Sequence, residues 1–92
     1  MRKNLDGGLL NAMHAFQKVI DSGSFTAAAE QMELTTAQVS RLISELEGRL
    51  GTKLLQRTTR QHALTDIGAT YAEQCRQVLA MVDEAETQAM GR

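Results

Sequence analysis

The amino-acid sequence predicts a mainly α-helical fold with one small β-hairpin. Apolar residues recur at helical spacing in most of the chain, aromatic residues number only two phenylalanines and one tyrosine, and proline is absent. A core of aliphatic side chains suits packed helices, and without proline no helix is forced to break. A length of 92 residues allows one small domain at most.

The first helix is predicted over about residues 8–21. Apolar residues recur there at spacings of three and four, from Leu9 to Ile20, and form one stripe. Gly23 can take the left-handed conformation that helix ends favour, so the helix is expected to end just before it.

A short second helix is predicted over about residues 25–32. Ser24 is its expected N-cap, and the alanines at 27–29 would let it pack closely against its neighbours. A tight turn at residues 33–34 follows, and this short helix would brace the next one.

A longer third helix is predicted from residue 36 to about Leu50. Thr35 and Gln38 have the spacing of a capping box, and Gly51 is expected to end the helix. Its apolar residues share one side. The opposite, polar side carries Thr36, Ala37, Ser40, Arg41, Ser44 and Glu45.

Two short strands and a long last helix complete the chain. Strands at residues 53–57 and 62–64 predict a β-hairpin, and Thr65 is the expected cap of a helix over about residues 66–89. At 1.5 Å per residue this helix would be about 35 Å long. Its apolar residues are spaced 4, 3, 4, 3 and 4, which is a heptad seam typical of pairing between two copies. The seam consists of Tyr71, Cys75, Val78, Val82, Ala85 and Ala89.

Two helices joined by a tight turn and followed by a hairpin predict a winged helix-turn-helix over residues 1–65, with a separate long helix over 66–92. The net charge is −1, but residues 34–64 hold five basic and two acidic residues, whereas residues 65–92 hold two basic and five acidic ones. Because nucleic-acid binding depends on the local field, the basic middle favours double-stranded DNA as the partner.

The third helix is expected in the major groove, whose width admits one α-helix. Thr36 and Ala37 are small enough for a close approach to base edges, and Gln38 and Arg41 suit adenine and guanine. Two alternatives stay open: Gln38 only completes the cap, and Arg41 only solvates the helix.

The predicted wing is basic, because residues 48–64 contain no acid. Lys53, Arg57 and Arg60 would therefore lie along the sugar–phosphate backbone or in the minor groove. An ordinary solvated hairpin is the alternative. Ser24 and Thr26 begin the second helix, where free amides suit a phosphate, although plain capping explains Ser24 equally well.

Catalysis and metal binding are not expected. His14 and His62 have no partner at metal-ligand spacing, Cys75 belongs to the seam, and neither a hydrolase motif nor a glycine-rich phosphate loop is present. No run of residues approaches the roughly 20 apolar ones of a membrane span, and the first residues do not form a signal peptide. We therefore expect a cytoplasmic, nucleoid-associated protein that is not an enzyme, has no cofactor and does not contact a membrane.

The ordered motifs of this chain resemble the N-terminal domain of LysR-type transcriptional regulators. The matching stretches are residues 16–19, 23–30, 39–43, 46–58 and 64–68. The resemblance implies a homodimer held by antiparallel linker helices on a palindromic DNA site, and it allows a tetramer in a full-length protein. It also implies that Thr36, Ala37, Gln38 and Arg41 face base edges. Phosphates or the minor groove would be faced by Ser24, Thr26, Ser40, Arg57, Thr58 and Arg60.

The chain departs from the family pattern in two places. The family usually has Ser, Gln and Pro or Ser before a small residue where this chain has residues 35–38, so Gln38 is expected to change the base preference. The effector-sensing domain is missing, and we expect an excised fragment rather than a stand-alone protein, with the small-molecule effector bound elsewhere. The rival hypothesis is a winged-helix protein-interaction adaptor that does not bind DNA, which a basic wing opposes.

Overall fold

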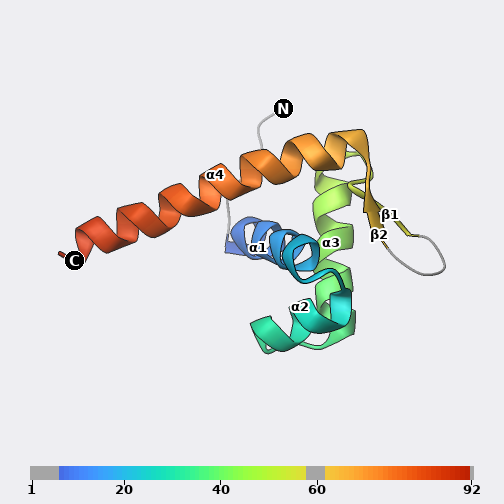
Figure 1. Ribbon diagram of the computed structural model, residues 1–92, viewed down its shortest axis with the longest axis horizontal. Coiled ribbons are helices and arrows are strands. Elements are labelled where there is room, and N and C mark those ends of the chain that lie inside the picture. Colours follow the sequence, from blue (N-terminus) through green and yellow to red (C-terminus); the bar gives the residue numbers. More distant parts are fainter. Residues whose placement is uncertain (1–6, 58–61, 92) are drawn as a thin grey trace.

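Four helices and one two-stranded antiparallel sheet make up the part of the protein described in the computed structural model, residues 7–57 and 62–91 (Figure 1). The elements in chain order are α1 (Gly7–Ser22), α2 (Phe25–Met32), α3 (Thr36–Leu50), β1 (Leu55–Arg57), β2 (His62–Leu64) and α4 (Asp66–Ala89). This architecture confirms the predicted mainly α-helical fold with a β-hairpin.

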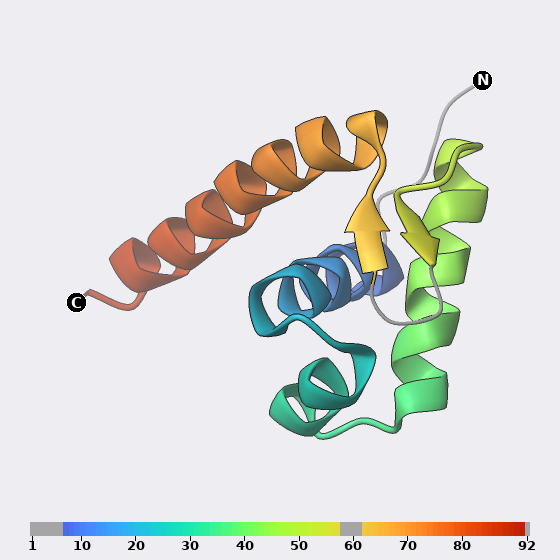
Figure 2. The same cartoon turned by 45° about the vertical axis from the view of Figure 1, so that its right-hand side comes forward.

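Helix α1 lies at the centre, in contact with α2, α3 and α4. Figure 2 shows the sheet beside α3, on the side where α4 begins. The core is mainly aliphatic, with two buried phenylalanines, and it draws on all four helices, on Leu54 and on the first residue of β1. Its largest fully buried side chains are Phe16, Val39, Ile43, Leu46, Leu54 and Cys75.

Local capping accounts for where three helices begin. The hydroxyl oxygens of Ser24 and Thr65 accept hydrogen bonds from the amides of Ala27 and Gly68, both at 2.9 Å. Thr35 begins α3 with a complete capping box. These three residues are the N-caps that the sequence predicts, because each bond spans only three residues.

The turn between α2 and α3 contains a feature that the sequence does not predict. Glu33 adopts a left-handed backbone conformation with φ of 59°, although side chains with a Cβ rarely do so. Its amide donates to the carbonyl of Glu30 and that of Leu34 donates to the carbonyl of Ala29, which closes the end of α2.

Strand β1 begins two residues later than predicted, at Leu55 instead of Lys53. It pairs with β2 in the register Leu55 with Leu64 and Arg57 with His62. The residue before it, Leu54, donates its amide to the side chain of Glu47 rather than to a strand. The Leu55 amide also donates to Glu47, and the ladder begins at this residue, opposite Leu64.

Candidate nucleic-acid interface

The N-terminal half of α3 is held by its cap and open to solvent. Thr35 Oγ1 accepts the Gln38 amide at 3.0 Å, and Gln38 Oε1 accepts the Thr35 amide at 2.8 Å. Val39 and Ile43 are buried on the inner side of the helix. On its outer side the structure exposes the four residues predicted to contact bases, which are Thr36, Ala37, Gln38 and Arg41.

Gln38 therefore has a structural role in the free protein. Its side-chain oxygen is engaged by the Thr35 amide, whereas a bidentate contact with adenine uses both the oxygen and the nitrogen of the amide. Such a contact would require that oxygen to be shared with the cap or released from it. Arg41 carries no comparable constraint from the cap, so the two residues are not equivalent candidates for reading a base.

The start of α2 combines an N-cap with an exposed threonine. Ser24 Oγ accepts the Ala27 amide, and Ser22 Oγ donates to the Ser24 carbonyl at 3.0 Å. Thr26 is exposed in the first turn. The structure thus shows Ser24 as a cap, and a phosphate contact at this position stays a prediction. Ser40 of α3 is half-buried.

The hairpin supplies the remaining predicted contacts. Lys53, just before β1, has a side chain that is 79% exposed, with Nζ 3.6 Å from Glu47 Oε1. Arg57 is the last residue of β1. Thr58 and Arg60 fall outside the described residues, so their contacts with DNA stay predictions from the sequence.

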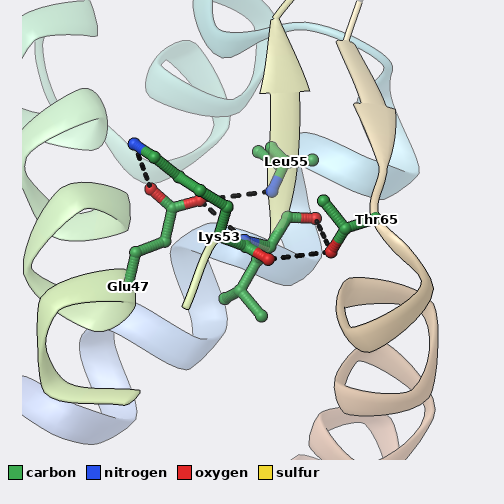
Figure 3. A network of polar contacts seen from close by, with 5 residues as sticks. Glu47, Lys53, Leu55 and Thr65 are labelled. Carbon is green, nitrogen blue, oxygen red and sulfur yellow. Dashed lines mark hydrogen bonds and ion pairs between the residues drawn. The ribbon is translucent and has the colours of Figure 1, made fainter. Parts of the chain in front are cut away.

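Glu47 is the residue of this region that the sequence analysis missed. One of its carboxylate oxygens accepts the amides of Leu54 at 2.8 Å and Leu55 at 3.2 Å, and the other faces Lys53 (Figure 3). The side chain is only 11% exposed. The carboxylate thus holds the start of the wing against α3. The only sign of this role in the sequence is that Glu47 is an acidic residue directly before residues 48–64, which contain no acid.

The predicted heptad seam of α4 divides into two parts. Cys75 is fully buried and Tyr71 half-buried within the chain's own core, where the Tyr71 ring lies 6.0 Å from that of Phe16. Burial is the main cause that raises the pKa of Tyr71 to about 12, and the interaction with the Cys75 thiol adds to it. Burial also raises the pKa of the Cys75 thiol. Both groups are therefore neutral at physiological pH.

The rest of the seam faces solvent. Val78 is 40% exposed, Ala85 and Ala89 are exposed, and Val82 is half-buried. Met81, which the seam did not include, is 67% exposed beside them. A second copy of the chain can reach these residues, whereas the Cys75 side chain is already covered.

Neither a membrane span nor a metal site is found in the described part of the chain. Among residues 7–57 and 62–91, no helix combines the length and the apolar character that crossing a bilayer requires. The same residues contain no group of three or more His, Cys, Asp or Glu side chains placed to hold a metal ion.

Residues 10–69 match the family model described as bacterial regulatory helix-turn-helix protein, lysR family. Over 82 residues the chain is 46% identical to an HTH-type transcriptional repressor from Pseudomonas aeruginosa strain UCBPP-PA14. Over 79 residues it is 42% identical to the HTH-type transcriptional activator AaeR from Escherichia coli K12. These matches cover 89% and 86% of this chain but 26% of each relative, so the chain spans about a quarter of their length.

Two solved structures of similar fold contain DNA. One is the BenM DNA-binding domain with benA site 1 DNA, with a TM-score of 0.83, 30% identity, and coverage of 88% of this chain and 91% of that one. The other is the complex of the CbnR DNA-binding domain with DNA, with a TM-score of 0.80, 27% identity, and coverage of 90% and 98%.

Proposed function

The chain belongs to the lysR family of bacterial regulatory helix-turn-helix proteins, and we propose that it binds a specific double-stranded DNA site as a homodimer. It would serve as the DNA-binding part of a longer transcriptional regulator. The observation that carries the proposal is the exposed N-terminal half of α3, whose polar residues lie opposite its buried side. The complexes of the BenM and CbnR domains with DNA support it.

Helix α3 would enter the major groove with its first two turns. Thr36 and Ala37 allow close approach to the bases, and Arg41 is the leading candidate for a guanine contact, since its fork of donors matches the two acceptors of guanine. Gln38 would make a bidentate contact with adenine only if the oxygen that caps the helix were shared or released. We therefore rank Arg41 above Gln38 in setting the sequence preference.

The contacts around α3 would supply affinity rather than base identity. The wing residues Lys53, Arg57, Thr58 and Arg60 would lie on the DNA backbone or in the minor groove, where cations displace condensed counterions. Ser24, Thr26 and Ser40 would approach phosphates at the other edge of the helix-turn-helix.

The second half of α4, residues 78–89, would form the dimer interface. Its open apolar residues, Val78, Met81, Val82, Ala85 and Ala89, share one side of the helix. Two such helices packed antiparallel would place two copies of α3 on a palindromic site, and further pairing into a tetramer would belong to the whole regulator. In this proposal residues 1–65 read DNA and residues 66–92 connect the copies.

The rest of the proposal concerns the whole regulator. We place it in the bacterial cytoplasm, on the nucleoid, with the effector-binding domain outside this chain. Relatives include both a repressor and an activator, so the direction of regulation does not follow from the DNA-binding part. The family is one of regulatory proteins rather than enzymes.

A binding titration tests the proposal. A DNA site selected by the wild-type chain from a random pool is titrated by fluorescence anisotropy at several salt concentrations. Log Kd should rise linearly with log salt, and Arg57→Ala should lower that slope by about 1 on every sequence. Arg41→Ala should reduce the preference for the selected site over one with a changed guanine by about 1–3 kcal/mol. Affinity that is indifferent to salt and to Arg57 would instead favour the protein-interaction adaptor.

A further inference from the structure

The backbone of Leu54 joins three parts of the molecule. Its amide donates to Glu47 of α3 at 2.8 Å, and its carbonyl accepts the amide of Thr65, the N-cap of α4, at 3.0 Å. The Thr65 hydroxyl donates to the neighbouring Lys53 carbonyl at 2.8 Å. The Leu54 side chain is fully buried. One peptide segment thus connects α3, which would be the recognition helix, with the wing and the start of α4.

Gly68, in the first turn of α4, packs directly on this segment. A Cβ at this position would overlap the Leu54 carbonyl oxygen and lie 2.9 Å from its carbonyl carbon. Both are backbone atoms, so no flexible side chain could move aside. We call the four residues Glu47, Leu54, Thr65 and Gly68 the Leu54 joint.

The joint fixes where α4 begins and, together with the buried side chains of Ala72 and Cys75 farther along the helix, orients it relative to α3. From Gly68 to Val82 the helix covers about 21 Å at 1.5 Å per residue. A tilt of about 10° at Gly68 would then move Val82 by about 3.6 Å, close to the 3.4 Å rise of one base pair. Because two copies would meet near Val82, a small change at the joint would alter the separation of their recognition helices by a base pair or more.

We propose that the Leu54 joint sets the spacing between the two half-sites that the dimer binds, while leaving the bases of each half-site unaffected. Glu47, Thr65 and Gly68 are then positioning residues for spacing, none of which needs to touch DNA. This inference rests on the proposed dimer, and it separates two kinds of specificity that one small domain would otherwise combine: base identity from α3 and half-site distance from the joint.

The test uses a set of DNA duplexes that carry the selected half-sites at spacings from three base pairs shorter to three longer than the wild-type optimum. Kd is measured for each duplex and for a single half-site. Gly68→Ala should move the optimum by about one base pair or lower the preference for it at least about threefold, with single half-site affinity unchanged. The matched control is Gly48→Ala, a helical glycine of α3 whose added Cβ meets nothing within 4 Å, and its optimum should stay that of the wild type.

Thr65→Val provides a second test that adds no atoms to a crowded site. It replaces the first test if circular dichroism shows that Gly68→Ala is not folded. It keeps the shape of the side chain but removes its bonds to Lys53 and to the Gly68 amide, so the spacing preference should weaken. Thr65→Ser keeps the hydroxyl and should restore it. If every folded variant keeps the wild-type optimum and preference, the joint does not set spacing. If wild-type binding ignores the second half-site, the proposed dimer itself fails, and the inference fails with it.

Discussion

The first half of α4, residues 66–77, packs into the domain, whereas the second half, residues 78–89, extends away from it (Figure 1). Ala72 and Cys75 are buried in the first half, while Val78 is 40% and Met81 67% exposed in the second. Both halves carry the same apolar spacing. A heptad pattern therefore identifies the apolar side of a helix but does not say whether the same chain or another copy covers it.

The largest effect should come from placing a charge in the first half. Cys75→Glu would put an unpaired carboxylate at a position with no exposure, and we expect a loss of about 3–5 kcal/mol in the free energy of unfolding. Since a domain of this size is stable by about 5–14 kcal/mol, we expect this variant to unfold at a clearly lower temperature than the wild type. Urea unfolding followed by circular dichroism measures the loss.

The control for this experiment is Cys75→Ala, which removes only the sulfur and should cost about 1 kcal/mol. A Cys75→Glu variant as stable as the control would show that the first half of α4 is not part of the core. The comparison between the two halves would then be wrong.

The same substitution in the second half should leave folding intact and break the proposed dimer. Val78→Glu and Val82→Glu would bring like charges together between two copies, and we expect the dimer dissociation constant to rise at least tenfold, about 1.4 kcal/mol. Sedimentation equilibrium measures this change. Ala80→Glu is the matched control, because Ala80 is exposed and lies about 200° around the helix from Val78. An unchanged mass for both seam variants would place the interface elsewhere.

Local features of the sequence were the easiest to predict. The caps at Ser24, Thr35 and Thr65 each depend on a bond across three residues, so residue type and spacing identify them. The exposed side of α3 followed from its apolar stripe for the same reason. Base identity did not follow, because Gln38 supports both the cap and a base contact.

Features that join distant elements could not be predicted in this way. Glu47 binds the amides of Leu54 and Leu55 across the end of a helix, and Gly68 matters only because the Leu54 carbonyl lies against it. Neither contact has a repeating pattern along the chain. Glu33 was missed for another reason: the left-handed turn it occupies favours glycine, and the sequence has a glutamate there.

The smallest effect concerns pH and reports on the first half of α4 alone. Tyr71 ordinarily ionises near pH 10, whereas burial raises its pKa to about 12 in the folded chain. Between these values the unfolded chain loses the phenolic proton and the folded chain retains it. Stability should therefore be complete below pH 10 and fall as the pH rises toward 12. Because the ring is only half-buried, solvent screening should limit the loss to about 1 kcal/mol.

Since the chain has one tyrosine, the ultraviolet absorbance of its phenolate measures this ionisation directly. Tyr71→Phe keeps the ring next to Phe16 and should remove the tyrosine's share of the pH dependence. The charged variants of Val78 and Val82 should leave the Tyr71 titration unchanged, because they act in the other half of the helix. A Tyr71 pKa near 10 in the wild type would mean that α4 leaves the core in solution, and the distinction between its two halves would disappear.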